Sequence, residues 1–582
     1  MITYALSCLD RMKTEHSYRN LFDIFLSHGD RTALEFKVDG NIVKVSFAEM
    51  ETPVTHVANA LMEKLQGCEK GFVALKLDNC PEWPILYWGI LLAGFKPFLI
   101  DYRHPLPLTQ FFLKEGGAVA IIAAEELETG NGAVSLVASD LIALDKKTLL
   151  DLAKQSPKDG KHMERLQSYA FGTEVALCTS GTTSTAKVYV YNGRAIANQM
   201  LSAEQIITEN DYLLSDREIK NLAFLPLHHI FGFLACYLWF SFFGKTLVFP
   251  DGKAPSALLA ACREHGVTHI LAVPLLVNNI VTGIQRKLKK QSKAKQNAFK
   301  AMCAISRFAQ RISPIFGIKL AKKLLKKSVL DNLVGTSLEV IICGGGHVLP
   351  NTLNIINSIG YYTVCGFGMT EIGISSLNLK RSLNSRLSGC VGVPMSCLEY
   401  RVVPLEGSKP NVGALQVKGE TIHSGRMLDG VQVPPTFTED GWFETGDIGR
   451  LEDGALYIEG RLKEVIINES GENVYPDELE DTFTGLQGIT QFTVMGIPKD
   501  AESKYEDIAL IMETSKDVND ENFTQALMKE ITARNAALPV FKKVSAVLIT
   551  AEPLPLSNGI KVKRAEIKKQ IANGASHYVR LK

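Results

Sequence analysis

The sequence predicts an α/β protein in which a large N-terminal domain, with two mostly parallel βαβ subdomains and a small β subdomain, precedes an α+β C-terminal domain. Three observations favour this fold class. Strand-like and helix-like stretches alternate between residues 72 and 100, and this order is typical of right-handed parallel units. After Gly389 short strands separated by turns prevail. From Glu464 onward strands and helices alternate again in a compact module.

Length and composition narrow the class of protein. The chain has 582 residues, of which 46% are hydrophobic, so we expect two or more domains with large cores. A formal net charge of +1 gives no case for nucleic-acid binding. The eleven cysteines are odd in number and include no CxxC pair, which favours a reducing compartment without disulfides or a zinc site.

The expected location is the cytoplasm. Asp10 and Arg11 come too early for the apolar core of a signal peptide. The longest uncharged apolar stretch, residues 230–244, is shorter than the roughly 18 residues needed to span a bilayer. We therefore expect this stretch to form a buried helix.

The first elements are predicted from local patterns. Residues 32–44 read as a hairpin with Asp39-Gly40 at its turn. Ser46 and Glu49 have the spacing of a capping box that opens a helix toward Leu65. The next predicted elements are a buried strand over 72–77, a helix over 81–93, a strand over 97–100 and less regular surface excursions over 125–161.

One loop of small residues lies between the apolar stretches 175–177 and 188–191. It reads Cys178-Thr179-Ser180-Gly181-Thr182-Thr183-Ser184-Thr185-Ala186-Lys187. Small residues let backbone N–H groups approach phosphate oxygens, and the lysine adds a point charge, so such a loop can wrap a polyphosphate. It is not a Walker A loop, which has Gly directly before Lys. The alternative is an ordinary Ser/Thr-rich turn.

Further polar and glycine-rich stretches follow predicted strands. His228 and His229 lie at a turn before the apolar helix, and either is a core residue or the wall of a substrate pocket. Gly344-Gly345-Gly346 follows the strand 338–343, and Gly366-Phe367-Gly368-Met369-Thr370-Glu371 follows the next one. Both are expected to form turns at the carboxyl ends of parallel strands, where open α/β sheets bind ligands.

A basic segment stands apart from the rest of the chain. Residues 281–330 contain fourteen Lys or Arg and no Asp or Glu, interleaved with apolar residues. The pattern predicts one or two basic amphipathic helices. Three interpretations stay open: a solvated basic face, peripheral contact with an anionic membrane surface, or binding of an acidic protein partner.

Six motifs in order resemble those of the adenylate-forming (AMP-binding) superfamily, which includes acyl-CoA synthetases, peptide-synthetase adenylation domains and firefly-type luciferases. The resemblance covers residues 20–570. The motifs are the loop 178–187, residues 225–232, Gly344-Gly345-Gly346, residues 368–371, Thr445-Gly446-Asp447 and Gly460-Arg461. The basic insert before Gly344 and the run from Gly460 to Pro476 look most like those of long-chain fatty acyl-CoA synthetases.

The resemblance implies a two-step reaction with ATP, Mg²⁺ and coenzyme A. A carboxylate, expected to be a medium- or long-chain fatty acid, attacks the α-phosphate of ATP and gives acyl-AMP and pyrophosphate. A thiol then attacks the acyl-AMP to form a thioester. The first step joins two anions, so the site has to cancel charge and align the nucleophile.

The resemblance also implies roles for individual residues around the nucleotide. The β- and γ-phosphates are assigned to Thr179, Ser180, Gly181, Thr182, Thr183 and Lys187. Thr370 is placed on the α-phosphate and Glu371 on Mg²⁺. Adenine is expected between Phe367 and the backbone of Gly344, Gly345 and Gly346. Asp447 is expected to bind the ribose hydroxyls, Arg461 the ribose or phosphate, and His229 is placed near the acyl carboxylate.

The catalytic cation of the family is a lysine in the C-terminal tail. The motif from Pro555 to Arg564 places Lys561 in that role. Lys463 takes the hinge position, so the resemblance divides the chain into an adenylation domain, 1–462, and a mobile domain, 463–582.

Three positions depart from the family pattern and keep alternatives open. Ser184 and Ala186 replace a Gly and a Pro in the phosphate loop, and Ile560 replaces the Gly before Lys561. One alternative is a catalytically impaired protein that binds an acyl group or a nucleotide. A different observation, the acid-free segment 281–330, keeps the other alternative open: adenylation followed by transfer of the acyl group to an acyl or peptidyl carrier protein, which presents acidic helices.

Overall fold

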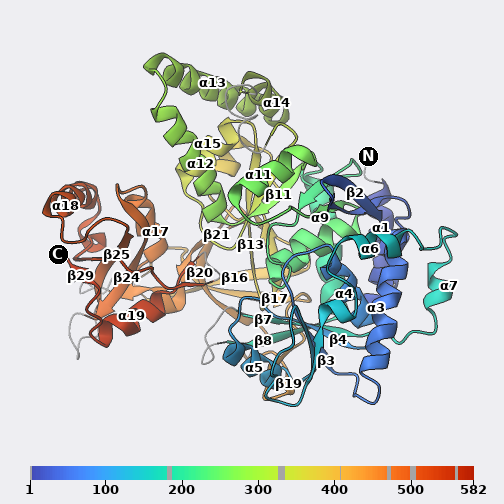
Figure 1. The fold of residues 1–582 in the computed structure, drawn as a ribbon. Helices are drawn as coiled ribbons and strands as arrows, with labels where there is room; N and C mark the ends of the chain where they lie inside the picture. The colour runs from blue at the N-terminus through green and yellow to red at the C-terminus, as the bar shows by residue number, and fades with distance from the viewer. Residues whose placement is uncertain are drawn as a thin grey trace. The chain divides into compact units, whose positions relative to one another are not determined.

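The computed structural model describes residues 3–179, 186–325, 335–406, 408–467, 473–498, 506–557 and 561–582. The chain forms two compact units, of which the first comprises Met1–Glu399 with Lys418–Thr436, and the second Tyr400–Val417 with Phe437–Lys582. The predicted α/β class is confirmed, with parallel sheets in the larger unit (Figure 1). The domain division after residue 462 stays a prediction, because compactness does not locate a hinge.

An eight-stranded sheet forms one half of the first unit, in the order β19-β18-β8-β7-β4-β3-β5-β6. The five strands from β7 to β6 are parallel, and β8 and β18 pair antiparallel beside them. The bounds are β3 Phe72–Lys76, β4 Lys96–Leu99, β5 Ala118–Ala123, β6 Val134–Val137, β7 Glu174–Cys178, β8 Val188–Asn192, β18 Gly425–Leu428 and β19 Val431–Val433. Helix α4 (Glu82–Leu92) makes the predicted crossover from β3 to β4.

A nine-stranded sheet forms the other half, in the order β15-β14-β13-β12-β11-β9-β10-β1-β2. Its central strands, from β13 to β1, are parallel. The bounds are β1 Thr32–Val38, β2 Asn41–Ser46, β9 Lys220–Leu222, β10 Thr246–Val248, β11 His269–Ala272, β12 Val340–Cys343, β13 Tyr362–Met369, β14 Gly373–Leu377 and β15 Val393–Pro394.

Helices connect and flank the strands of these sheets. In the first unit they are α1 Thr3–Thr14, α2 Tyr18–Leu26, α3 Glu51–Lys64, α5 Leu106–Glu115, α6 Lys147–Ala153, α7 His162–Leu166, α8 Gly193–Ser202, α9 Glu204–Glu209, α11 Pro255–Glu264, α12 Pro274–Lys289, α13 Lys293–Ile312, α14 Pro314–Leu325, α15 Pro350–Ser358 and α16 Leu383–Leu387. The predicted basic helices are thus α12 to α14, which lie at the margin of this unit (Figure 1).

Two local predictions are confirmed in detail. The hairpin turns at Asp39 and Gly40, both with positive φ, as expected for the twist of a two-residue hairpin. In the capping box the Ser46 N–H donates to Glu49 Oε2 (2.9 Å), and the Glu49 N–H donates to Ser46 Oγ (3.3 Å).

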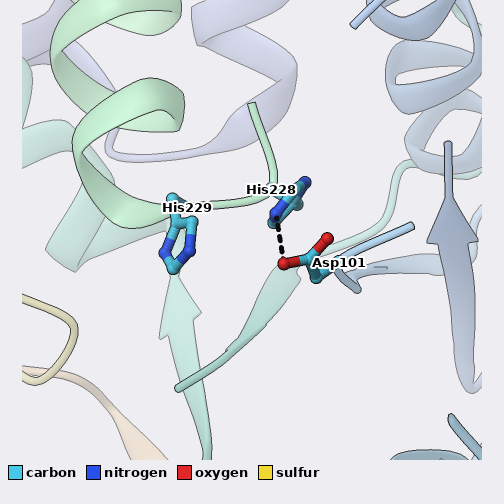
Figure 2. Close-up of side chains that lie close together, drawn as sticks. All are labelled: Asp101, His228 and His229. Carbon is cyan, nitrogen blue, oxygen red and sulfur yellow. Dashed lines mark ion pairs between the residues drawn. The ribbon is translucent and has the colours of Figure 1, made fainter. Parts of the chain in front are cut away.

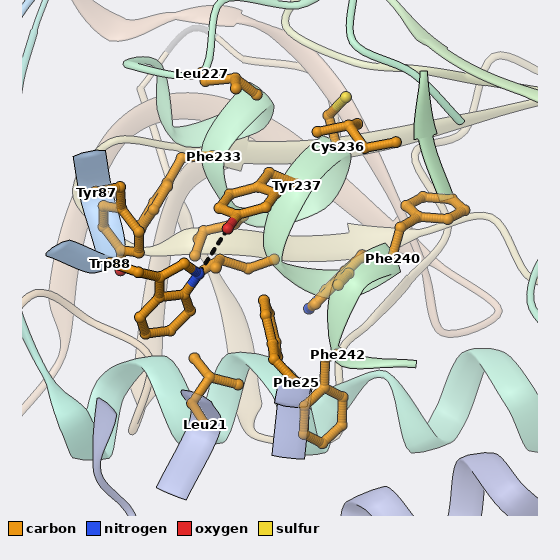
Figure 3. Close-up of a cluster of buried hydrophobic side chains, with 14 of the residues drawn as sticks. Leu21, Phe25, Tyr87, Trp88, Leu227, Phe233, Cys236, Tyr237, Phe240 and Phe242 are labelled. Atoms are coloured by element: carbon orange, nitrogen blue, oxygen red, sulfur yellow. Dashed lines mark hydrogen bonds between the residues drawn. The ribbon is translucent and has the colours of Figure 1, made fainter. Parts of the chain in front are cut away.

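The core of the first unit is rich in aromatic rings, as Figure 3 shows. The stretch predicted as a buried helix is a π-helix, η3 (Phe231–Trp239), followed by α10 (Phe240–Phe242). Trp88 Nε1 donates to the hydroxyl of Tyr237 at 2.7 Å, which satisfies both buried polar atoms. In the part of the chain that the structure describes, no helix combines the length and apolarity that crossing a bilayer requires.

Two expectations for this unit are wrong. Residues 125–161 are not only surface excursions, because β6 extends the edge of the eight-stranded sheet. Gly366 and Gly368 do not form a turn but lie inside β13, and the turn follows at residues 370–372. The physical reason is close packing, since a Cβ on Gly368 would lie 2.5 Å from the carbonyl oxygen of Gly373 on the partner strand.

The second unit holds two four-stranded sheets, ordered β16-β17-β20-β21 and β24-β25-β26-β29. The first is the predicted small β subdomain, and the second belongs to the predicted α+β module. The strands are β16 Leu398–Pro404, β17 Gly413–Gly419, β20 Phe443–Glu452, β21 Ala455–Arg461, β24 Ile489–Pro498, β25 Glu506–Thr514, β26 Ala546–Thr550 and β29 Val579–Arg580. Two short pairs, β22 Ile466–Ile467 with β23 Asn473–Val474 and β27 Leu556–Ser557 with β28 Lys561–Val562, accompany helices α17 Pro476–Phe483, α18 Glu521–Ala536 and α19 Arg564–Ala572.

Candidate active site

The base of the predicted phosphate loop is closed by backbone pairing. Cys178 of β7 pairs with Val188 of β8, and the Thr179 N–H donates to the carbonyl of Lys187 at 2.9 Å. The Lys187 N–H donates in turn to Thr179 Oγ1 at 3.0 Å. Lys187 is exposed at this base. The predicted phosphate ligands Ser180, Gly181, Thr182 and Thr183, together with Ser184, lie outside the described residues.

The turn with Thr370 and Glu371 is attached to strand β8, which leaves that loop. The Tyr191 hydroxyl donates to the carbonyl of Thr370 at 2.7 Å, and the Tyr189 hydroxyl donates to Glu371 Oε1 at 3.1 Å. The structure therefore brings two predicted parts of the site together through two tyrosines that our sequence analysis missed. Their period-two spacing on a predicted strand was an available signal, because it places both side chains on one face.

His423 packs against this contact. Its ring centroid lies 4.6 Å from that of Tyr189, and the backbone N–H of His423 donates to the backbone carbonyl of Glu371 at 2.9 Å. Burial raises the pKa of Tyr189, and the Glu371 charge raises it further, so the hydroxyl stays a donor. Burial lowers the pKa of His423 to about 4, and the charges of Arg426 and Lys187 act in the same direction. His423 is therefore neutral near pH 7.

This burial predicts a pH-dependent loss of stability. The pKa of His423 is about 4 in the folded protein against an ordinary value of 6.5, so between these values the unfolded chain binds a proton that the folded chain excludes. As pH falls through this window, the free energy of unfolding should fall by about 3 kcal/mol from this residue. Urea denaturation of the wild type and His423→Gln from pH 7 to pH 4 measures the difference. His56→Gln, on the exposed face of α3, is the control, and parallel curves for wild type and His423→Gln would contradict the assignment.

The triglycine stretch lies directly beside the strand that carries Phe367. The Gly344 N–H donates to the carbonyl of Ala272 at 3.0 Å, which continues the ladder of β11 and β12. A Cβ on Gly344 would lie 3.1 Å from the Phe231 ring and 3.5 Å from the carbonyl oxygen of Gly366. Gly345 has φ +79° and is exposed, as is Gly346. The backbone here is open to a flat ligand that a side chain would block.

The two histidines lie beside an acidic residue at the end of β4. Asp101 and His228 are 3% and 2% exposed, and His228 Nε2 lies 3.4 Å from Asp101 Oδ2 (Figure 2). Arg103 donates from Nε (2.9 Å) and Nη2 (2.7 Å) to the same carboxylate. Burial alone would raise the pKa of Asp101, but the close approach of the His228 ring and the hydrogen bonds from Arg103 hold it well below its usual range. His229 is half-buried. The residue before it, His228, is held in place by the carboxylate of Asp101.

Asp101, His228 and His229 have ligand atoms within 4.8 Å of one another, a spacing that a metal ion could use. The Arg103 guanidinium already donates hydrogen bonds to both oxygens of the Asp101 carboxylate. We therefore assign Asp101 to positioning His228, and through it His229, and not to binding a metal ion. The sequence analysis missed Asp101, although its position just after a parallel strand was a signal.

The other two residues predicted to bind the nucleotide, Asp447 and Arg461, belong to the second unit. Asp447 on β20 is directly opposite Arg461 on β21, and Arg461 Nε lies 3.2 Å from Asp447 Oδ1. The Asp447 N–H donates to Thr445 Oγ1 at 3.1 Å, and the Thr445 hydroxyl donates to the carbonyl of Leu415 at 2.7 Å. The Asp447 carboxylate is buried and the Arg461 side chain is exposed. The pair therefore offers a fixed hydrogen-bond acceptor next to a positive charge.

The tail around Lys561 is held by a buried arginine. Lys561 pairs through its backbone with Ser557, while Ile560 lies outside the described residues. Arg564, three residues on, is 7% exposed and contacts three carboxylates, one in η5 (Leu462–Glu464) and two in α17. These partners are Glu480 (2.8 Å), Asp477 and Glu464, and Arg564 Nε also donates to Thr493 Oγ1 (3.0 Å). Nothing local in the sequence marks this cluster.

The predicted hinge residue adjoins the same cluster. Lys463 is exposed in the short helix η5 (Leu462–Glu464), next to Glu464, which Arg564 binds. One buried side chain thus ties the segment predicted as the hinge to the segment predicted as the catalytic tail.

Comparison with known proteins places this chain among ligases. The long-chain-fatty-acid–CoA ligase of Salmonella typhimurium is 24% identical and matches 95% of this chain and 94% of its own length. The chloroplastic long-chain-fatty-acid–acyl-carrier-protein ligase AEE15 of Arabidopsis thaliana is 22% identical over 94% of this chain and 83% of its own.

Solved structures share the fold. ATP-bound MatB from Rhodopseudomonas palustris is 20% identical with a TM-score of 0.66, over 94% of this chain and 98% of that one. The o-succinylbenzoate coenzyme A synthetase MenE from Bacillus subtilis, in complex with ATP and magnesium, is 19% identical with a TM-score of 0.65, over 94% and 99%.

A model of the family described as "AMP-binding enzyme" matches residues 24–426, which is more than half of the chain. The resemblance that the ordered motifs indicated is therefore confirmed. Adenylate-forming enzymes use ATP with Mg²⁺ and coenzyme A. The chain belongs to the AMP-binding enzyme family.

Proposed function

We propose that the protein is an acid–thiol ligase that activates a medium- or long-chain fatty acid as acyl-AMP and transfers the acyl group to coenzyme A. The observation that carries this proposal is the attachment of the Thr370–Glu371 turn to β8 through Tyr189 and Tyr191. It links a hydroxyl and a carboxylate to the strand that leaves the phosphate loop. Such a group of residues suits a nucleoside triphosphate with its Mg²⁺ ion.

The first step needs the charge of two anions to be cancelled, and this chain offers candidates for that task. We assign the β- and γ-phosphates to the loop that begins at Thr179 and ends at Lys187. Thr370 is assigned to the α-phosphate, where a hydroxyl donor would stabilise charge that develops as the carboxylate attacks. His229, beside the anchored His228, is assigned to the acyl carboxylate.

Glu371 fits a magnesium ion on the chemistry of its surroundings. A carboxylate offers about four lone-pair sites, and the Tyr189 hydroxyl uses one of them. The side chain is half-exposed, so it keeps capacity for a hard cation with oxygen ligands. Bound there, Mg²⁺ would neutralise phosphate charge.

Adenine and ribose are assigned by the same reasoning. The open backbone of Gly345 and Gly346 with the ring of Phe367 would accept the base, and Asp447 with Arg461 would bind the ribose. We keep Lys561 as the catalytic cation and Lys463 as the hinge. The cytoplasmic location likewise stays a prediction.

Carboxylate-dependent exchange between ATP and pyrophosphate tests the proposal directly. Acids from acetate to stearate are supplied singly, and we expect exchange to rise from short to medium or long chains. A thioester assay with coenzyme A then tests the second step. The absence of exchange with every acid would reject adenylation and support the impaired binding protein that Ser184, Ala186 and Ile560 left open.

Glu371→Gln should weaken the response to Mg²⁺ in the exchange assay. The variant keeps the shape and an acceptor for Tyr189 but loses the charge, so half-maximal exchange should need about 10- to 100-fold more Mg²⁺. Glu420→Gln is the matched control, since Glu420 is an exposed carboxylate paired with Arg194 (2.7 Å) on the same unit. An unchanged Mg²⁺ requirement in Glu371→Gln would remove Glu371 from the metal site.

A second acceptor has one observation in its favour. Helices α12 to α14 carry many Lys and Arg side chains, and residues 281–330 contain no Asp or Glu. This charge is complementary to the acidic helices that acyl carrier proteins present. The similar ligase AEE15 of Arabidopsis thaliana is named for an acyl carrier protein as its acceptor. Supplying coenzyme A and an acyl carrier protein in parallel decides between them, because thioester on coenzyme A alone would exclude the carrier.

A further inference from the structure

The margin of the first unit carries a row of exposed apolar side chains on two helices. They are Ile305, Phe308 and Ile312 of α13 and Phe316 and Leu324 of α14, which are 51%, 66%, 73%, 61% and 39% exposed. Ile305, Phe308 and Ile312 have the spacing of one helical face. We call these five residues the apolar ridge. In globular proteins scattered exposed apolar residues are ordinary, but a cluster on one surface marks an interaction site.

The opposite faces of both helices are fixed, so the ridge is held outward. On α13, Gln310 is buried and its Nε2 donates to Ser306 Oγ (2.9 Å) and to the carbonyl of Asn357 (2.9 Å). The buried Arg386 donates to Gln310 Oε1 at 2.7 Å. On α14, Lys322 reaches the carbonyl of Thr336 (3.1 Å) while Ile318 and Ala321 are buried. The ridge therefore cannot turn inward without breaking a buried polar network.

Exposed cations are frequent on the two helices that carry the ridge and on α12, which precedes them. From Val281 to Leu330 there is no Asp or Glu. The exposed cations of this stretch in the described residues are Arg286, Lys287, Lys289, Lys290, Lys293, Lys295, Lys300, Arg311, Lys319 and Lys323. Lys319 and Lys323 flank the apolar positions of α14, and Arg311 flanks Ile312 on α13. An apolar face bordered by lysines is the pattern of a helix that lies in a membrane interface.

We propose that the apolar ridge and its cations dock on the surface of an anionic lipid bilayer, with α13 and α14 lying in the interface rather than crossing it. The ridge side chains enter the acyl boundary, and the long lysine stems reach back to the headgroups. One feature favours lipid over an acidic protein. Lysines outnumber arginines among these cations, whereas protein interfaces favour Arg and are depleted in Lys.

Vesicle co-sedimentation of the full-length protein tests the proposal. The probes are phosphatidylcholine vesicles with and without phosphatidylglycerol, at low and high salt. We expect binding to the anionic vesicles, and weaker binding as salt screens the cations. Phe308→Ser/Ile312→Ser should lower the partition coefficient by about tenfold or more, since two large side chains lose their burial.

Matched controls separate the ridge from general surface effects. Val431→Ser and Val540→Ser remove side chains that are 64% and 83% exposed but lie outside the ridge, and both should bind vesicles like the wild type. Lys319→Glu/Lys323→Glu should lower binding to anionic vesicles and leave the thermal unfolding midpoint within a few degrees.

Two outcomes would overturn the proposal. One is equal sedimentation of the wild type with both kinds of vesicle or with neither. The other is ridge-dependent binding to an acyl carrier protein without binding to vesicles, which would assign the surface to a protein partner. Exchange between ATP and pyrophosphate in solution is measured on every variant, and because the ridge lies outside the proposed active site, vesicle binding is judged separately from the ligase reaction.

Discussion

Lys561→Ala should lower the rate of acyl-AMP formation by about 100- to 1000-fold, which corresponds to about 3–4 kcal/mol in the transition state. The reason is electrostatic. A carboxylate that approaches a phosphate brings two anions together, and a lysine between them lowers the cost of that approach. The chain places this lysine in β28, paired through its backbone with Ser557.

The effect should be confined to the first half-reaction. When acyl-AMP is supplied directly, its carbonyl is attacked by a thiol and no second phosphate has to be approached, so thioester formation should fall much less. Single-turnover assays of each half-reaction measure this difference.

Lys563→Ala is the matched control, because Lys563 lies two residues further on and pairs with Glu566 at 3.5 Å. This partly exposed pair should contribute less than about 1 kcal/mol, and the control should retain adenylation. Equal losses in the two variants would show that the tail needs positive charge in general and not Lys561 in particular.

Arg564→Met should destabilise the second unit by about 3–5 kcal/mol. Arg564 is buried among Glu464, Asp477 and Glu480. Burial alone would lower the pKa of Arg564, but these three carboxylates raise it well above its usual range. Removing the cation leaves three carboxylates close together without the positive charge that they share, and like charges in a partly buried site repel strongly.

Urea denaturation and hydrogen exchange of helix α17 measure the loss. Lys568→Met is the control on the same helix α19, because Lys568 is 43% exposed and contacts the single carboxylate Glu506. We expect a change below about 1 kcal/mol there. Adding Glu480→Gln to Arg564→Met should recover part of the lost stability, and no recovery would show that uncompensated charge is not the cause.

Arg564→Met should also slow adenylation, because Arg564 begins the helix that follows Lys561. We regard Arg564 as a positioning residue. Its effect on rate should be rescued in part by Arg564→Lys, which restores charge without the guanidinium fork, whereas Lys561→Ala has no such rescue.

Predictions from the sequence succeeded where the information is local. The hairpin at Asp39-Gly40 and the Ser46–Glu49 capping box depend on residues a few positions apart, and both are present. The turn predicted at Gly366 and Gly368 failed because a glycine pattern does not distinguish a turn from a strand that another strand approaches closely.

The candidate site divides in the same way. Ordered motifs were enough to identify the family and to propose Lys187, Thr370, Glu371 and Asp447 as site residues. They could not find the groups that hold these residues. Tyr189 meets Glu371 across 182 positions of sequence, and Arg564 meets Glu464 across 100. Such pairs form only when folding brings segments that are distant in sequence into contact.

By itself, the sequence determined the fold class, the order of the motifs and the charge of the segment 281–330. Only the tertiary structure decided which side of α13 faces outward, that strands β18 and β19 return to the first sheet beside β8, and which buried cation holds the tail. The physical reason is that backbone preference and periodicity are set within a few residues, whereas burial and ion pairing depend on the packing of elements far apart in the chain.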